Sequence, residues 1–354
     1  MSQSPIFAAH DAVVIGTSTG GVEALRTLVA GLPKNFAAAV LVVMHVGDRD
    51  SILPSLLAGS TRLPVRHARD GDVIEPGRIL VAPPDVHLMI TRDKANGGRL
   101  CRAVLSRGAR ENHTRPAIDP LFRSAAAAFG PRAIGVVLTG MLDDGTAGLQ
   151  AIKACGGRAI VQLPEEALAP DMPDSAIRNV DVDRVLRLAD IGHVLEQMVD
   201  ESLAADRTVP REVPEWVRLE NRFVLEDSSM EALSRIASPS TFTCPECHGS
   251  LWEMHGVVPK RFRCHTGHAF TERHLCEQQG TAVEEALWSA MRALQEKEKL
   301  LRQMADSAIA AGYAQTAAEY LEGAGRAQRD GEVLRRVLMT HGQARHAAQP
   351  DRVG

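Results

Sequence analysis

A serine between two glycines is the first residue in this chain whose setting points to chemistry. Ser18 stands in the stretch Gly16-Thr17-Ser18-Thr19-Gly20, which fits the pattern G-x-S-x-G. That pattern places a serine hydroxyl on a sharp turn between a strand and a helix, close to backbone N–H groups of the helix N-terminus. We therefore expect Ser18 to act as a nucleophile. For this stretch alone, a phosphate-binding loop and a purely structural turn stay open as alternatives.

A histidine and two aspartates complete the set of groups that acyl transfer requires. His45 closes the predicted strand 39–45, and Asp143 and Asp144 follow the predicted strand 133–139. A serine nucleophile needs a histidine base, and the base needs a carboxylate that orients it. Each residue also has an ordinary alternative: His45 as a hydrogen-bonded strand-end residue, and either aspartate as a helix N-cap.

Four of the six cysteines lie close together near the C-terminal side of the chain. Cys244 and Cys247 form a C-x-x-C pair, and Cys264 follows after sixteen intervening residues, with His268 four positions beyond it. Such spacing is typical of closed zinc sites with four protein ligands. The expected ligands are Cys244, Cys247, Cys264 and His268, with His265, Cys276 and His274 as alternatives for the fourth. Free thiols and a redox C-x-x-C pair are the competing interpretations.

These side chains need a scaffold that brings distant segments together. Unbroken Val, Ile, Leu and Ala runs alternate with amphipathic stretches, as in a doubly wound α/β domain with a mostly parallel sheet. The predicted strands are 13–15, 39–45, 78–82, 87–91, 100–106, 133–139 and 158–162, and the predicted helices are 22–30, 51–58, 118–128, 146–154 and 190–200. Strands 87–91 and 100–106 flank the turn Asn96-Gly97-Gly98 and predict an antiparallel hairpin. Ser18, His45 and the aspartates follow three strand ends, where such domains bind ligands.

The rest of the chain divides into smaller parts. A region with Pro, Ser and many charged residues, containing a short helix near 228–236, is predicted as a linker. Beyond the cysteines, two amphipathic helices broken at Gly312 present an apolar stripe that suits either a core or a partner surface. We expect a catalytic domain 1–200, a linker 201–241, a zinc-ribbon-like unit 242–276, a helical hairpin 277–340 and a disordered tail 341–354.

Composition sets limits on partners and location. The 354 residues include 45% hydrophobic and 24% charged residues, which suits a globular core. A formal net charge of -4, from 40 basic and 44 acidic residues, gives no reason to expect a nucleic-acid partner. The apolar runs are far shorter than the roughly 20 residues of a membrane-spanning helix, and the N-terminus has no secretory signal pattern. We expect a cytoplasmic protein without membrane insertion.

Five motifs, in order, resemble the catalytic domain of the chemotaxis protein-glutamate methylesterases. They are VVIGTSTGGVEAL, VVMH, ILVAPPDVHLMI, NHTRPAIDPLF and GVVLTGMLDDGTAGL, within residues 11 to about 198. The resemblance implies a catalytic triad of Ser18, His45 and Asp144, since Asp144 rather than Asp143 directly precedes the glycine. It also implies hydrolysis of glutamyl methyl esters on chemoreceptors, with side-chain glutamine deamidation as a second reaction, and no cofactor for catalysis.

Other site residues follow from the same interpretation. Backbone N–H groups of Thr19 and Met141 are the candidates for stabilising the oxyanion. His113 and Arg115 lie in a matching motif and are candidates for the substrate groove, with packing or surface roles as the alternative. The chain departs from the family at Leu142, where many members have glycine, and at Met44 and Gly47 beside the histidine, where a Gln and a Pro are usual.

The resemblance also bears on regulation and partners. The best-known members carry a phosphorylatable receiver before the esterase, whereas here the first strand begins near residue 11, so we expect a receiver-less chain. The segment after residue 240 resembles the zinc-ribbon-like tail of some receiver-less members. The expected partners are methylated chemoreceptor cytoplasmic helices and, through the C-terminal region, other chemosensory proteins. A general serine esterase and a catalytically silent signalling scaffold are the alternatives. A nucleotide-binding domain is disfavoured, because His45 stands where an acidic ribose-binding residue is expected.

Overall fold

A seven-stranded parallel sheet is the centre of the first part of the chain. The computed structural model describes residues 10–46, 50–93, 100–204, 212–225 and 229–348. The strand order in the sheet is β3-β4-β2-β1-β7-β8-β9, and every pairing is parallel. The strands are β1 (Ala12–Thr17), β2 (Ala39–Met44), β3 (Val65–His67), β4 (Ile79–Val81), β7 (Ala133–Val137), β8 (Arg158–Gln162) and β9 (Arg184–Leu186). The predicted doubly wound α/β class is confirmed.

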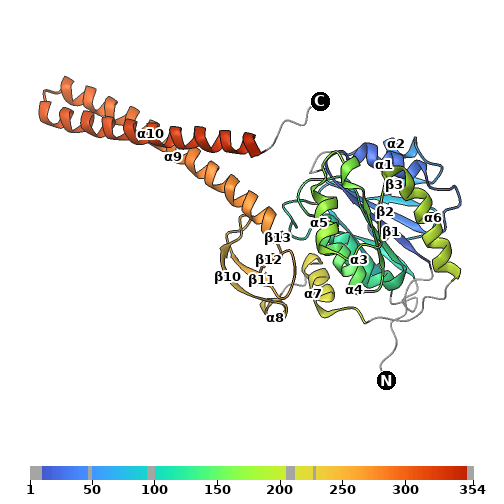
Figure 1. The fold of residues 1–354 in the computed structure, drawn as a ribbon. Coiled ribbons are helices and arrows are strands. Elements are labelled where there is room, and N and C mark those ends of the chain that lie inside the picture. Colours follow the sequence, from blue (N-terminus) through green and yellow to red (C-terminus); the bar gives the residue numbers. More distant parts are fainter. Residues whose placement is uncertain (1–9, 47–49, 94–99, 205–211, 226–228, 349–354) are drawn as a thin grey trace. The chain divides into compact units, whose positions relative to one another are not determined.

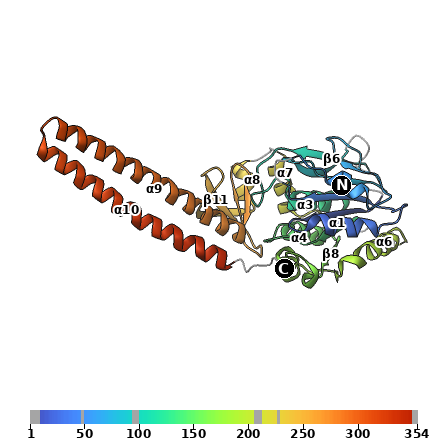
Figure 2. The same ribbon diagram turned by 90° about the horizontal axis from the view of Figure 1, so that it is seen from above.

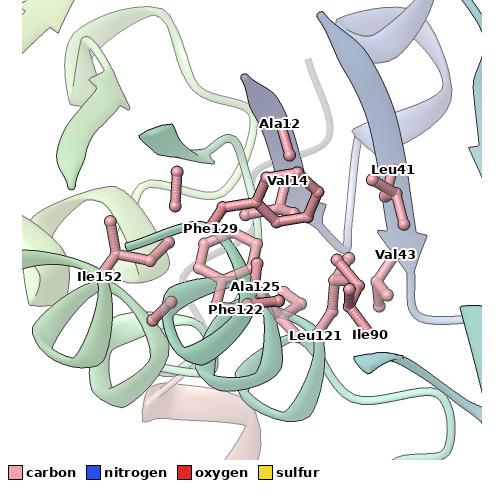
Figure 3. Close-up of a cluster of buried hydrophobic side chains, with 14 of the residues drawn as sticks. Ala12, Val14, Leu41, Val43, Ile90, Leu121, Phe122, Ala125, Phe129 and Ile152 are labelled. Atoms are coloured by element: carbon pink, nitrogen blue, oxygen red, sulfur yellow. The ribbon is translucent and has the colours of Figure 1, made fainter. Parts of the chain in front are cut away.

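Helices cover both faces of this sheet because its central strands are apolar on both sides (Figure 1). One face carries α1 (Gly21–Ala30), α2 (Leu53–Ala58) and α6 (Leu188–Ala204); the other carries α3 (Ile118–Phe129), α4 (Thr146–Ala154) and α5 (Asp171–Asn179). Successive residues of β1 point into opposite cores: Val14 joins Leu41 and Phe122 (Figure 3), whereas Val13 packs with Leu25 of α1. Each such buried side chain contributes about 1.5–3 kcal/mol.

An antiparallel hairpin stands apart from the main sheet. Its strands are β5 (His87–Arg92) and β6 (Cys101–Ser106), paired from His87 with Ser106 to Arg92 with Cys101. The predicted hairpin is therefore confirmed, while its predicted turn, Asn96-Gly97-Gly98, lies outside the described residues. Helix α3 packs against this hairpin, and the backbone N–H of Ile90 donates to Ser124 Oγ at 3.0 Å.

The region predicted as a linker is more ordered than expected. It contains α7 (Glu215–Val224) and α8 (Met230–Ser234), followed by the start of β10 (Ala237–Thr243). Helix α7 is amphipathic, and Val217 and Phe223 are buried because they belong to two apolar clusters of the first unit. The expected short helix near 228–236 corresponds to α8. An open linker over 201–241 therefore does not describe this segment, although residues 205–211 and 226–228 lie outside the described residues.

Four antiparallel strands form a small unit around the cysteines. They are β10, β11 (Ser250–Met254), β12 (Arg261–Cys264) and β13 (Ala269–Thr271), in that order in the sheet. We call residues 237–271 the ribbon. Its core includes Leu251, Phe262 and Phe270, packed with Cys244 and Cys264. Met1–Leu275, which includes the ribbon, forms one compact unit, and Cys276–Gly354 forms a second.

The second unit is a pair of long helices. Helix α9 (Glu272–Ala310) is followed by α10 (Ala314–Ala348), and the two lie side by side (Figure 2). Gly312, with a positive φ of 79°, lies between them, so the predicted helical hairpin is confirmed. The prediction of a disordered tail over 341–354 is wrong for residues 341–348, which belong to α10, and residues 349–354 lie outside the described residues. Within the described part of the chain, no helix is both long and apolar enough to cross a membrane.

Candidate active site and metal-binding cluster

Ser18 lies on the turn that joins β1 to α1. Its backbone N–H donates to Thr139 O of the strand-end loop at 3.0 Å, and its carbonyl accepts from Gly21 N at 2.9 Å. Gly20 has a φ of 78°, in the left-handed region that favours glycine. At Gly16 a Cβ atom would lie 2.3 Å from Ile118 Cγ2, so glycine lets α3 approach the turn. The glycines of the motif thus serve the turn and the helix that packs behind it.

His45 reaches Ser18 because β1 and β2 are neighbouring parallel strands. His45 Nδ1 lies 3.2 Å from Ser18 Oγ, and His45 Nε2 lies 2.8 Å from Asp144 Oδ2. Only 14% of the His45 side chain is exposed. Since an ionised carboxylate only accepts hydrogen bonds, Asp144 places the ring proton on Nε2 and leaves Nδ1 free to accept the serine proton.

Asp144 is a fully buried carboxylate surrounded by donors. The donors are His45 Nε2 at 2.8 Å, Ile118 N at 2.7 Å, Gly145 N at 3.0 Å, Asn112 Nδ2 at 3.1 Å and Asp119 N at 3.3 Å. Burial alone would raise the pKa of Asp144, but the hydrogen bond and charge of His45 and the Ile118 N–H hold this pKa well below its usual value. Asp144 is therefore an anion throughout the neutral range.

The neighbouring aspartate faces elsewhere. Asp143 Oδ1 accepts from Thr271 Oγ1 at 2.7 Å and lies 2.8 Å from His274 Nδ1. Asp144 alone of the two contacts His45. Neither aspartate acts as a side-chain N-cap for α4, whose N-cap residue is Gly145; instead, Asp119 Oδ1 accepts from the N–H groups of Gly145 and Gly148 at 3.0 and 2.6 Å.

Two backbone N–H groups are available near Ser18. Those of Thr19 and Met141 donate to no other described residue, whereas the N–H groups of Gly140 and Leu142 bond Ala169 O and Asp171 Oδ2. The loop carrying Met141 passes close to the serine, since a Cβ at Gly140 would lie 3.0 Å from Ser18 Cβ. Leu142 adopts a φ of 64°, a conformation that glycine adopts more readily.

The two groove candidates have different surroundings. Arg115 is held within the domain: its Nε and Nη2 donate to Asp85 Oδ1 at 3.0 and 2.7 Å, and its Nη1 donates to Arg107 O and Gly108 O. His113 remains 46% exposed and contacts the Glu246 carboxylate of the ribbon through Nδ1. These contacts fit a packing role for Arg115 and a surface position for His113.

Several residues around Ser18, His45 and Asp144 were not predicted from the sequence. Asn112 bonds Asp144, Thr114 Oγ1 lies 3.5 Å from His45 Nε2, and Asp119 is buried close to Asp144. Burial and the Asp144 charge raise the pKa of Asp119 well above its usual value. All three belong to the motif NHTRPAIDPLF, so the motif was the available signal. Thr271 offered none, because it contacts this region only through the fold.

The four expected metal ligands come together in the ribbon. One ligand atom from each of Cys244, Cys247, Cys264 and His268 lies within 4.8 Å of the others. His268 Nδ1 lies 3.8 Å from Cys244 Sγ and 3.5 Å from Cys264 Sγ, and the Cys247 and Cys264 sulfur atoms are 3.7 Å apart. Zinc bonds of about 2.3 Å to sulfur and about 2.0 Å to nitrogen place tetrahedral ligands roughly 3.5–3.8 Å apart. These residues therefore fit a metal ion.

Comparison with known proteins assigns the first half of the chain. The sequence model of the family described as CheB methylesterase matches residues 13–195. A Leptospira interrogans protein, provisionally named protein-glutamate methylesterase/protein-glutamine glutaminase, is 37% identical over 55% of this chain and 97% of its own length. A Methanosarcina mazei protein-glutamate methylesterase/protein-glutamine glutaminase is 37% identical over 54% of this chain and 51% of its own.

A solved structure gives the same result. The CheB methylesterase catalytic domain of Thermotoga maritima is 34% identical, with a TM-score of 0.52, and the match covers 54% of this chain and 100% of that domain. Residues 13–195, which the family model matches, include Ser18, His45 and Asp144. The chain belongs to the CheB methylesterase family.

Proposed function

We propose that this chain is a protein-glutamate O-methylesterase that uses Ser18, His45 and Asp144 as a catalytic triad. The observation that carries the proposal is the hydrogen-bonded series from Ser18 Oγ through the His45 ring to Asp144, at the carboxyl ends of three strands. The names of the Leptospira and Methanosarcina relatives support the ester of a glutamyl side chain as the substrate.

The first half of the reaction follows from this geometry. Ser18 Oγ attacks the side-chain carbonyl carbon of the ester while His45 Nδ1 takes the hydroxyl proton. The negative charge on the tetrahedral carbonyl oxygen is stabilised by the N–H groups of Thr19 and Met141, and one such donor is typically worth about 3 kcal/mol. His45 then passes its proton to the methoxy oxygen, and methanol leaves an acyl-enzyme on Ser18.

The second half regenerates the enzyme. His45 removes a proton from a water molecule that attacks the acyl-enzyme, and Ser18 leaves with the proton that returns from His45. Throughout, Asp144 holds the imidazole in one tautomer and stabilises its protonated form. A glutamine side chain reacts by the same steps with ammonia as the leaving group. The word glutaminase in the relatives' names supports this deamidation as a second activity.

The proposed partners come from the family resemblance. We propose methylated helices of chemoreceptors as the substrate and the cytoplasm as the location, with exposed His113 at the edge of the substrate groove. The C-terminal helices present exposed apolar residues, including Trp288, Ile309 and Tyr313, which support binding of other chemosensory proteins there.

We further propose that the cluster of Cys244, Cys247, Cys264 and His268 holds one structural zinc ion. The ligand set and the separations of its atoms support this proposal. Four protein ligands leave no open position on the ion, so the zinc would supply folding energy and take no part in ester hydrolysis.

The substrate class is tested by comparing two esters. The full chain should release methanol from methylated chemoreceptor with a far higher kcat/KM than it hydrolyses a small aryl ester such as p-nitrophenyl acetate. The opposite order would support a general serine esterase. If the chain releases neither methanol nor nitrophenol, the result would support a catalytically silent scaffold.

A further inference from the structure

The last strand of the ribbon is joined to the segment that carries Asn112. The backbone N–H of Asn112 donates to Ala269 O of β13 at 2.8 Å, and the N–H of Thr271 donates to Asn112 Oδ1 at 3.1 Å. Glu111 also forms a parallel bridge with Ala269. The ribbon thus contributes β-type hydrogen bonds next to the triad, although Thr271 and Asn112 are 159 positions apart.

These bonds decide which end of the Asn112 amide faces the triad. The Thr271 N–H can only donate, so it must face the oxygen of the amide. The NH₂ end therefore points to the carboxylates, where Nδ2 donates to Asp144 Oδ1 at 3.1 Å and lies 3.4 Å from Asp119 Oδ2. If the amide were reversed, its NH₂ group would face the Thr271 N–H, which is also a donor. Its oxygen would face the carboxyl oxygens of Asp144 and Asp119, which are acceptors.

Thr271 also contacts Asp143, the residue that precedes Asp144 in the chain. Its hydroxyl donates to Asp143 Oδ1 at 2.7 Å, and only 2% of the residue is exposed. Thr271 therefore holds Asn112 through its backbone and, together with His274 Nδ1 at 2.8 Å from the same oxygen, holds Asp143 through its side chain. Asn112 bonds Asp144 directly, and Asp143 precedes Asp144 in the chain. Both contacts bear on the position of the same carboxylate.

The Asn112 segment needs such support, because its backbone is strained. Asn112 and His113 have φ values of 51° and 61°, in the left-handed region. A non-glycine residue in that region costs of order 1–3 kcal/mol and persists where surrounding structure enforces it. Here the enforcing contacts are the turn bond from Thr114 N to Glu111 O at 3.0 Å and the hydrogen bonds to Ala269 and Thr271. The ribbon therefore adds two hydrogen bonds to those that the turn makes within itself.

A buried ion network anchors the ribbon against the domain. Glu111 bonds Arg123 of α3 at 2.7 Å and Arg263 of β12 at 2.9 Å, and Glu220 of α7 bonds Arg261 of β12 at 2.9 Å. All five side chains are at most 8% exposed. Removing one partner of a buried pair strongly destabilises a protein, because it leaves an uncompensated charge. Two of the three arginines belong to the ribbon, so these ion pairs fix the ribbon to the rest of the unit.

We propose that Thr271 is a positioning residue for the triad, through which the ribbon sets the place of Asp144. This inference rests on the proposed function of Ser18, His45 and Asp144. The hydroxyl of Thr271 orients Asp143, its backbone N–H orients Asn112, and together they hold Asp144 against His45. Loss of the hydroxyl should lower kcat by about ten-fold and leave KM unchanged, since a hydrogen bond to a charged group has an effect of that order.

The test uses the full chain and three variants. Thr271→Val keeps the shape and the backbone N–H but removes the hydroxyl, Thr271→Ser restores the hydroxyl, and Thr241→Val is the matched control at an exposed position of β10. The measurements are kcat and KM for methyl-ester hydrolysis, the rate at which a fluorophosphonate modifies Ser18, and the melting temperature. We expect Thr271→Val to lose about ten-fold in kcat and in labelling rate, and Thr271→Ser and Thr241→Val to match the wild type.

The outcomes separate this inference from the proposed function. A wild type that is labelled at Ser18, together with a Thr271→Val variant that melts lower but is labelled equally fast, would show a merely structural role and overturn the inference. If Thr271→Val does not fold, Asp143→Asn weakens the same contact and should reduce labelling likewise; unchanged labelling would overturn the inference. A wild type that is labelled but releases no methanol contradicts the proposed substrate alone. A wild type that does neither contradicts the triad and the inference together.

Discussion

The Asp144 carboxylate stays ionised although it is fully buried, because five hydrogen-bond donors surround it. Three of them are backbone N–H groups, of Ile118, Asp119 and Gly145, which cannot rotate away. The carboxylate is thus preorganised by the start of α3 and by the loop after β7. In this arrangement the Asp144 carboxylate accepts the Nε2–H of His45 and keeps the imidazole ring in one orientation.

Replacing this carboxylate by an amide tests that account at the residue scale. In Asp144→Asn, an NH₂ group must face some of the five donors, and the His45 tautomer is no longer fixed. We expect kcat for methyl-ester hydrolysis to fall by about 10³–10⁴-fold with little change in KM, as for other triads. The neighbouring variant Asp143→Asn is the control and should lose far less activity. Equal losses in the two variants would contradict the assignment of Asp144 over Asp143.

The contact between β1 and α3 links the serine turn to the aspartate at the scale of elements. Gly16 lies under Ile118, whose N–H donates to Asp144 Oδ2 at 2.7 Å. We expect Gly16→Ala to displace the start of α3, to lower the stability by about 1–3 kcal/mol and to reduce kcat. Gly59→Ala is the matched control, because its Cβ would meet no atom closer than 3.6 Å. Urea unfolding measures both; a Gly16→Ala variant as stable as wild type would contradict the close approach.

The ribbon offers a second test at this scale. We expect metal analysis of the purified chain to give about one zinc per chain, with none in Cys247→Ser and one in Cys276→Ser, because Cys276 is outside the cluster. Removal of the metal should lower the melting temperature, since a closed site contributes folding energy. Zinc lost from Cys276→Ser but retained in Cys247→Ser would refute this ligand set.

The central elements of the fold were predictable, and the edges were not. Strands β1, β2 and β7 are unbroken buried runs and β8 has a buried apolar centre, which identifies central parallel strands. Strands β3 and β9 have three residues each and are partly exposed, so they carry no readable pattern. The sequence of helix α7 predicts a linker, because charged residues surround its few buried ones. Burial against a distant partner, and not local preference, orders such a segment.

At the scale of the whole molecule, buried carboxylates make the free energy of unfolding depend on pH. Burial would raise the pKa of Glu111, but Arg123 and Arg263 lower it to about 2, and the pKa values of Glu220 and Asp144 are lowered as well. A carboxyl whose folded pKa lies below its unfolded value of about 4 stabilises the protein fully above that pH. This contribution is lost as the pH falls from about 4 towards 2.

Urea unfolding at pH 7, 5 and 3 checks this pH dependence. We expect a clearly lower midpoint at pH 3 than at pH 5. Between pH 7 and 5 the midpoint also responds to His87, whose pKa is lowered to about 4 by burial, and to Asp119, whose pKa is raised by burial. Because the ion network is buried, 0.5 M salt should change the midpoint little at neutral pH. A midpoint that does not fall at pH 3, or that falls strongly with salt at pH 7, would contradict the contribution of the buried pairs.

The meeting of Ser18, His45 and Asp144 could be predicted from the sequence, but the link of this site to the ribbon could not. Ser18, His45 and Asp144 each follow a recognisable strand, and the topology of a parallel sheet brings strand ends together. The spacing of Cys244, Cys247, Cys264 and His268 in the sequence predicts that these four side chains come together. Nothing in the local sequence of Thr271 or Asn112 indicates that they meet, because that contact depends on how segments 159 positions apart pack within one unit.

Methanol release by the wild type and by Ser18→Ala tests the central claim most directly. Both full-length proteins are incubated with methylated chemoreceptor, after circular dichroism has shown that they are equally folded. Removal of the nucleophile from a serine triad typically lowers the rate by 10³-fold or more. We predict steady methanol release by the wild type and a rate lower by about that factor for Ser18→Ala. Equal release by the two proteins would contradict the serine mechanism.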